Sequence, residues 1–270
     1  MRRQDPAARW MGAAILAVLG AVAAAAPLVA PGDPYRLTGP ALTAPSWTHP
    51  FGTDDLGRDV FAGVVHGAAT SLRVGAVGAA GALLLGVLVG GIAGMRGGWI
   101  DQALMRAADF VQAMPRFFLA ITAVSLFGGG LSLIMLVIAL TAWPGTARVF
   151  RSLVVSTRRR EFVLASQAAG APERWILRRH VVPLTISVAV AHASYQAGGA
   201  ILAEAGLSFL GLGDPSVMSW GTQLGFAQQM VREAWWTSVF PGLAIALTVL
   251  GCNLLADSVG HRTDRPQPIP

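Results

Sequence analysis

The sequence predicts an all-α integral membrane protein with six transmembrane helices. Of its 270 residues, 54% are hydrophobic and only 13% are charged, whereas soluble domains carry about 25% charged residues. The apolar residues form blocks close to the length of about 20 residues that a membrane-spanning helix needs. Arginines are concentrated in alternate segments between these blocks, as the positive-inside rule requires. This distribution explains the net charge of +6 without a nucleic-acid partner.

The first span is expected within residues 1–30. Arg2, Arg3 and Arg9 precede an apolar block that covers 11–30. One interpretation is a signal peptide that is cleaved near the alanine run at its end. The length of the block favours an uncleaved span with a cytoplasmic N-terminus.

Residues 31–70 are polar and contain several prolines, so they are expected to form an outward-facing loop. Its acidic turn is followed by a predicted short helix over about 59–67. The turn contains Asp54, Asp55, Arg58 and Asp59, which are close enough in sequence to pair. Two interpretations remain open, namely a surface cap and a contact with another protein.

The middle of the chain alternates between spans and short connections. The second span is rich in glycine, and small residues four apart allow helices to approach closely in lipid. Pro144 and Gly145 predict a kink in the fourth span. The expected segments are a second span over 72–94, an inner amphipathic segment over 95–110, a third span over 110–128, a tight outer turn over 128–130 and a fourth span over 131–150.

Residues 158–183 are too highly charged for lipid, because even one charge at the bilayer centre costs roughly 2.5–3.5 kcal/mol. We expect a cytoplasmic loop with two short helices separated by Gly170, the second beginning near Glu173. Small residues recur at helical spacing before the glycine, namely Ala165, Ala168 and Ala169. One interpretation is a helix that docks into a groove of another protein. The other is a basic loop that only fixes the orientation of the chain.

The fifth span, over 184–203, is the most polar. Polar groups at membrane depth face either the helix bundle or a water-filled path. The candidates for lining such a path are His192, Tyr195 and Gln196, and hydrogen bonding between helices is the alternative role.

Beyond this span, residues 205–235 are expected outside, with Trp220, Trp235 and Trp236 at the interface with lipid. A sixth span over 237–256 and a cytoplasmic tail over 259–270 complete the chain. Sixteen of the twenty arginines then lie inside, and both termini are cytoplasmic.

Several classes of function are disfavoured. The chain has no lysine, so it has no phosphate-binding loop of the lysine-containing type. It has one cysteine, and its five histidines are scattered, so no metal site is expected. No catalytic motif is present and no catalytic residue is assigned. The scarcity of carboxylates in the spans disfavours a proton-coupled carrier, and the two halves show no duplicated pattern.

Three segments resemble membrane subunits of binding-protein-dependent ABC importers. Residues 164–183 resemble the Glu-Ala-Ala coupling loop in the spacing of Gly170 and Pro183, although Leu164 stands at the glutamate position. Residues 49–59 and 203–221 resemble segments of the dipeptide and oligopeptide branch. The resemblance implies a type I ABC importer permease fold for residues 71–258, with a coupling loop at about 151–183.

The same resemblance implies roles for particular residues. The residues implied to couple to an ATPase are Glu161, Ala165, Ser166, Ala168, Ala169, Gly170, Arg174 and Pro183. Those implied to contact a solute-binding protein are Asp54, Asp55, Arg58, Asp59 and Trp220.

The implied function is that of a permease subunit for dipeptides and oligopeptides in a bacterial plasma membrane. Its implied partners are a second permease subunit, two ATPase subunits, an extracytoplasmic solute-binding protein and membrane lipid. ATP and Mg²⁺ would be bound by the ATPase subunits, and this chain itself would need no cofactor. The alternatives are import of nickel or haem by the same machinery, a membrane scaffold without a solute path, and a membrane-embedded enzyme.

Overall fold

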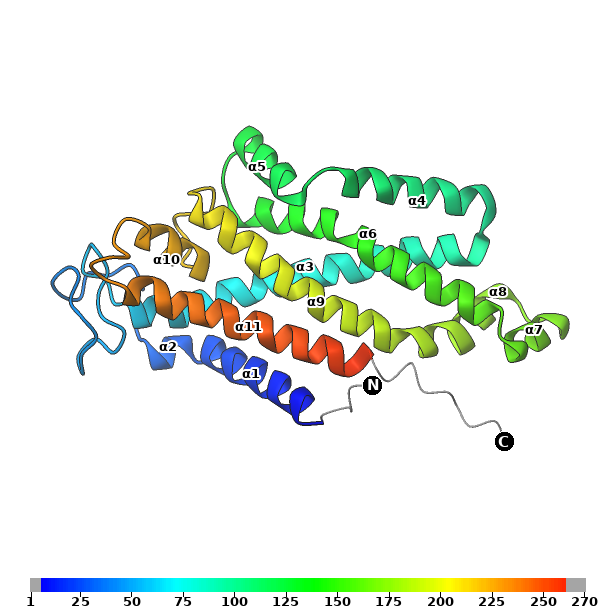
Figure 1. Ribbon diagram of the computed structural model, residues 1–270, viewed down its shortest axis with the longest axis horizontal. Coiled ribbons are helices and arrows are strands. Elements are labelled where there is room, and N and C mark those ends of the chain that lie inside the picture. Colours follow the sequence, from blue (N-terminus) through cyan, green and yellow to red (C-terminus); the bar gives the residue numbers. More distant parts are fainter. Residues whose placement is uncertain (1–5, 261–270) are drawn as a thin grey trace.

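The computed structural model describes residues 6–260, and within that range the regular secondary structure is helical apart from two isolated β-bridges. The long helices lie side by side (Figure 1). They are α1 (Pro6–Ala24), α3 (Val60–Arg96), α6 (Leu131–Arg158), α9 (Val182–Phe209) and α11 (Trp236–Gly260). Shorter elements are α2 (Ala26–Val29), α4 (Gly98–Ala113), α5 (Arg116–Phe127), α7 (Glu161–Ala168), α8 (Glu173–Ile176), a π-helical turn η1 (Leu177–Val181) and α10 (Trp220–Ala227).

The number of apolar helices agrees with the predicted all-α membrane fold. Four segments are long and apolar enough to cross a membrane: 60–96, 131–158, 173–209 and 236–258. A fifth is the pair α4 and α5, which is bent by 74°. Residues 8–24 of α1 form a shorter apolar helix. The two ends of the bundle differ (Figure 1). We name the end with α10 and the loop before α3 the outer pole, and the end with α7 and α8 the inner pole, after the orientation expected from the sequence.

The predicted short helix over 59–67 and the second span are one continuous helix of 37 residues, α3. Asp59 caps this helix, because its side chain accepts a hydrogen bond from the Phe61 amide at 2.9 Å. At 1.5 Å per residue α3 is about 55 Å long, which exceeds the thickness of the hydrocarbon layer. The non-helical part of the outer loop therefore ends at Asp59, and the predicted boundary at residue 71 falls within α3.

The third span, predicted over 110–128, is a broken helix that also includes α4, which was predicted as an inner amphipathic segment over 95–110. Pro115 disfavours helical geometry in the residue before it, and Met114 is extended, with φ −87° and ψ 130°. Helix α4 ends before this break, and α5 begins after it and has only 12 residues.

The coupling loop is shorter than the predicted range of 151–183. Helix α6 continues to Arg158, and residues 173–209 form one helical segment that includes α8, η1 and α9. Pro183 has no amide hydrogen to donate within this continuous segment, and it lies just after the π-helical turn η1, where the regular helical hydrogen bonding is already interrupted. The non-helical connections are thus confined to the residues on either side of α7.

Residues 205–235 are not a simple outer loop. Helix α9 continues to Phe209, and α10 packs inside the bundle against α9, α11 and α3. Trp220 is fully buried, and its indole N–H donates to the Val64 carbonyl at 2.9 Å. Trp236 is also buried, so of the three predicted interfacial tryptophans only Trp235 is exposed.

The centre of the bundle is the contact between α3 and α6, where the predicted close packing of small residues is found. A Cβ atom added at Gly90 would lie 2.3 Å from the Ala147 carbonyl oxygen, and one at Gly86 would lie 2.4 Å from the Thr146 Cβ.

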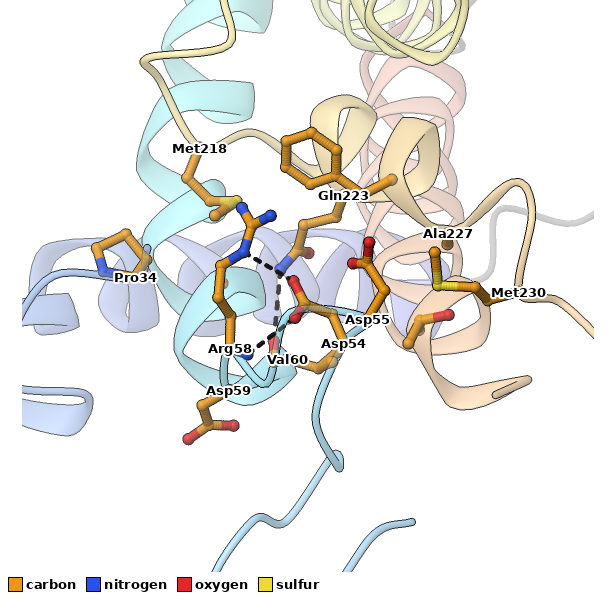
Figure 2. Close-up of a pocket in the computed structure, with 13 residues that line it drawn as sticks. Pro34, Asp54, Asp55, Arg58, Asp59, Val60, Met218, Gln223, Ala227 and Met230 are labelled. Carbon is orange, nitrogen blue, oxygen red and sulfur yellow. Dashed lines mark hydrogen bonds and ion pairs between the residues drawn. The ribbon is translucent and has the colours of Figure 1, made fainter. Parts of the chain in front are cut away.

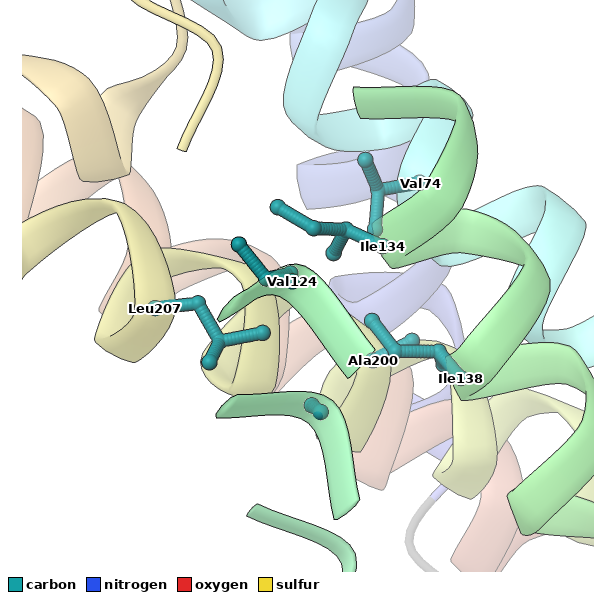
Figure 3. Close-up of a cluster of buried hydrophobic side chains, with 7 residues drawn as sticks. Val74, Val124, Ile134, Ile138, Ala200 and Leu207 are labelled. Carbon is teal, nitrogen blue, oxygen red and sulfur yellow. The ribbon is translucent and has the colours of Figure 1, made fainter. Parts of the chain in front are cut away.

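Toward the outer pole, α3, α5, α6 and α9 share a buried cluster (Figure 3). Its members are Val74, Ala120, Val124, Ile134, Ile138, Ala200 and Leu207. The predicted cytoplasmic tail lies almost wholly outside the described residues.

Candidate coupling and translocation sites

Helix α7 is held at the inner pole by one buried side chain. Val163 is fully buried in a cluster with Ile176, Val181, Phe150 and Val154, which come from α8, η1 and α6. This anchor was not identified from the sequence, although the apolar residues flanking the arginine-rich positions were a visible signal. The rest of α7 is thereby left at the surface.

Gly170 has the backbone conformation that the sequence predicted. Its φ is +81°, a left-handed value that glycine adopts readily. The amides of Gly170 and Ala171 donate to the carbonyls of Gln167 and Ser166 and so close the end of α7. A Cβ atom added to Gly170 would meet no atom within 4 Å, so the constraint is conformational and not one of space.

The exposed face of α7 carries both small and large apolar side chains. Ala165, Ala168 and Ala169 are exposed, as the docking interpretation requires. Phe162 and Leu164 are also exposed, by 42% and 50%. These two apolar side chains were not among the predicted coupling residues, and they give the face two protrusions beside the small residues.

The other predicted coupling residues lie on or beside this exposed face of α7. Ser166 donates to the Phe162 carbonyl at 2.9 Å, and its hydroxyl is 3.3 Å from Nε2 of His180. The ring of His180 lies 5.2 Å from the rings of both Phe162 and Trp175. Glu161, Arg174 and Pro183 are exposed. The α7–α8 unit is thus tied to η1 by side-chain contacts.

The three predicted path residues of α9 have different environments. His192 Nδ1 is 3.0 Å from the hydroxyl of Thr146 on α6. Gln196 is buried and donates from its amide to the Ala142 carbonyl at 2.6 Å. Gln196 therefore binds α9 to α6 and does not line a path in this conformation. Tyr195 is 59% exposed on the adjacent stripe.

At the outer pole, Asp54 and Arg58 form the ion pair that the sequence suggested, with 3.0 Å between Oδ2 and Nε. Arg58 also lies over the ring of Phe226 at 4.7 Å, and Figure 2 shows it beside Asp54 and Gln223 in a small pocket. Burial raises the pKa of Asp54, while the hydrogen bond and charge of Arg58 oppose that rise. Asp54 and Arg58 thus stabilise the loop, as the surface-cap interpretation predicts.

The other predicted contact residues of the outer rim differ in how far they are accessible. Asp55 is half-buried in the same pocket, and its Oδ1 is a buried atom without a hydrogen-bond partner among the described residues. Asp59 is occupied as the cap of α3. Trp220 is fully buried, so its side chain cannot make the predicted contact with a binding protein. Trp47, which the sequence analysis did not single out, is completely exposed on this rim.

A further buried acid was also missed. Glu204 is 1% exposed, and its Oε1 accepts hydrogen bonds at 2.7 Å from both Ser208 and Ser219. Ser219 in turn caps α10 by accepting from the Thr222 amide. Glu204 therefore joins the outer end of α9 to the start of α10. In the sequence, the signal for this connection between α9 and α10 was the polar character of Glu204 and the neighbouring serines.

Comparison with known proteins identifies the family. Residues 86–265 match the model of the binding-protein-dependent transport system inner membrane component. The chain is 40% identical over 233 residues to the dipeptide transport system permease protein DppC of Alkalihalophilus pseudofirmus, covering 85% of this chain and 77% of that protein. It is 37% identical over 257 residues to DppC of Bacillus subtilis, covering 94% and 80%. It is also 36% identical over 263 residues to the nickel transport system permease protein NikC of Escherichia coli K12, covering 95% and 94%. The chain belongs to the family of binding-protein-dependent transport system inner membrane components, and it is a multi-pass membrane subunit of such a system.

Proposed function

We propose that this chain and a second, homologous permease subunit form the translocation path for dipeptides and oligopeptides in a bacterial plasma membrane. Two ATPase subunits bind ATP and Mg²⁺ at the cytoplasmic pole, and an extracytoplasmic binding protein delivers the solute to the opposite pole. The similarity to proteins named as dipeptide permeases over most of the chain supports the choice of solute.

The observation that carries the proposal is the construction of α7. One side of this helix is anchored by Val163, while Phe162, Leu164 and Ala165 are exposed at the pole opposite the outer loop. An exposed apolar face on a firmly attached helix suits docking into a groove of another subunit. Movement of that subunit on ATP binding would be passed through α8 and η1 into α9, because these three elements are continuous.

The experiment is uptake of a labelled dipeptide by proteoliposomes that contain both permeases and both ATPases, with the binding protein supplied outside. We expect uptake that requires ATP, the binding protein and this chain together. A complex that assembles and hydrolyses ATP but accumulates no peptide would refute the proposed solute. A chain that never associates with the ATPase subunits would refute the importer function itself.

Nickel is a second candidate solute, because the chain aligns with nearly the full length of the nickel permease at 36% identity. The same proteoliposomes distinguish the two candidates when they are given radioactive nickel and the matching binding protein. Accumulation of nickel without accumulation of peptide would favour this alternative.

The proposed topology places both termini in the cytoplasm. In a variant lacking Cys252, single cysteines at Trp47 and Asp33 should react with an impermeant thiol reagent added outside intact cells, and a cysteine at Arg159 should react only after permeabilisation. All three positions are exposed, so reactivity depends on the side of the membrane and not on burial. Labelling of the Arg159 position in intact cells would reverse the orientation.

The outer rim is expected to receive the binding protein. The substitution Asp55→Arg reverses the charge of a half-buried carboxylate in the rim pocket beside Arg58. It should lower stimulation of ATPase activity by the binding protein several-fold, while basal ATPase activity stays unchanged. Glu233→Arg is the matched control, because this exposed acid precedes α11 on the same side. Equal effects of the two variants would show that general charge, and not the rim, controls stimulation.

A further inference from the structure

A polar layer crosses the bundle where α4, α6 and α9 meet. Gly145 lies near the middle of α6, and a Cβ atom there would be 3.6 Å from Cε1 of His192 on α9 and 3.8 Å from Nε2 of Gln112 on α4. Tyr195 is near the middle of α9 and is exposed. These positions lie near the midpoints of two long helices, so we place this layer near the bilayer midplane.

Arg116, which the sequence analysis counted among the cytoplasmic arginines, belongs to this layer instead, because it is the first residue of α5 at the break of the α4–α5 span. The rings of His192 and Tyr195 lie 6.3 Å apart, and Arg116 follows Gln112 by four residues and is close enough to both rings for electrostatic interaction. No carboxylate lies within ion-pair distance of Arg116 in the part of the chain that the structure describes. The nearby acid Asp109 is bound to Arg148, as is the amide oxygen of Gln112. A guanidinium at this depth is costly unless an anion accompanies it.

The backbone at Arg116 is also unusual for a membrane interior. The chain is non-helical between α4 and α5, and Ala113, Met114, Pro115 and Arg116 are all exposed. Irregular backbone at membrane depth is tolerated only where other protein covers it or where it lines a water-filled cavity. An exposed tyrosine and an unpaired arginine beside the break favour the second situation.

We infer that Arg116, together with the hydroxyl of Tyr195, binds the carboxylate of the peptide as it passes the bilayer midplane. This inference rests on the proposed function, because a dipeptide supplies the missing anion. A guanidinium can donate two parallel hydrogen bonds to a carboxylate, and a phenol can donate a third. His192 is engaged by Thr146 through Nδ1 and supports the layer from the side of α6.

The test compares two substrates in the proteoliposome assay, dialanine and dialanine amide, which lacks the carboxylate. In Arg116→Gln we expect uptake of dialanine to fall about tenfold or more, the loss that follows from removing one charged hydrogen-bond partner. Uptake of the amide should be unchanged or higher, since a cationic solute no longer meets a fixed positive charge. Each rate is divided by the wild-type rate for the same substrate, which cancels the preference of the binding protein.

Two control variants sharpen the result. Arg116→Lys keeps the charge and should retain part of the preference for dialanine. Arg106→Gln removes an exposed arginine from α4 and should leave the ratio of the two uptake rates unchanged. Equal losses of both substrates in Arg116→Gln would overturn the inference.

A fixed partner in the complex is the remaining possibility for Arg116. If Arg116→Gln lowers the amount of assembled complex, and neutralising an acidic residue of the second permease restores it, Arg116 pairs with that residue and the inference is wrong. A wild-type complex that carries neither dialanine nor its amide would instead refute the proposed peptide function, and with it the peptide as the ligand of Arg116.

Discussion

The substitution Gly90→Val is expected to abolish the folded permease. The Cβ atom of any residue at this position would lie 2.3 Å from the Ala147 carbonyl oxygen and 3.1 Å from its Cα. These are backbone atoms of α6, so no side-chain rotation relieves the contact. The two helices must separate along the most extensive helix contact in the bundle. Overpacking in a core typically costs about 1–3 kcal/mol, and we expect the upper end of that range or more.

The measurement is the thermal midpoint of the detergent-extracted chain, followed by size-exclusion chromatography after heating. Gly242→Val is the matched control, because this glycine of α11 has no atom within 4 Å of the position its Cβ would take. Both variants introduce the same side chain into a helix. We expect a large loss of monodisperse protein for Gly90→Val and little for Gly242→Val. Equal midpoints would show that α3 and α6 do not approach as closely as described.

The second large effect is expected at the end of α7, where Gly170→Val should uncouple ATP hydrolysis from transport. Valine is disfavoured at the φ of +81° that Gly170 adopts, with a cost of about 1–3 kcal/mol. The turn between α7 and α8 would change direction, while the spans would be untouched because nothing packs against this position. Uptake in proteoliposomes should fall to the level measured without ATP.

Two further variants separate backbone conformation from bulk. Gly170→Asn should retain more activity than Gly170→Val, because asparagine tolerates left-handed geometry better than β-branched residues do. Ala165→Trp keeps the backbone but adds bulk to the exposed face of α7, and it should also block docking. Ala103→Trp places the same bulk on an exposed position of α4 and should have little effect. Normal uptake by Gly170→Val and Ala165→Trp at equal membrane levels would exclude the docking role.

The sequence was sufficient to predict the fold class because hydrophobic blocks and arginine asymmetry are properties of the chain alone. It did not reveal where helices continue through polar residues. Helix α3 extends outward past the exposed Arg73, and α9 continues past Glu204, whose carboxylate accepts hydrogen bonds from two serines. The sequence also did not reveal that α4 and α5 form one span broken at Pro115.

The candidate site was predictable to a similar degree. Gly170 was identified because its role is a backbone conformation that one residue type favours. Trp220 was misplaced because its burial depends on α10 folding back between α3 and α9, which no local pattern indicates. Arg116 was assigned to the cytoplasmic entry of the third span, because its depth and its lack of an ion-pair partner among the described residues are properties of the folded chain.

Because residues 173–209 form one continuous helical segment, a movement at one end is transmitted to the other end. The 37 residues of this segment span about 55 Å from the inner to the outer pole. The backbone is helical throughout, so tilting the inner end by a few degrees displaces the outer end by several ångströms. Glu204 fastens α10 near that outer end, so α10 must travel with it. In the proposed import cycle, docking at α7 and opening at the outer pole are coupled through this segment, and the π-helical turn η1 is the one place where it can bend.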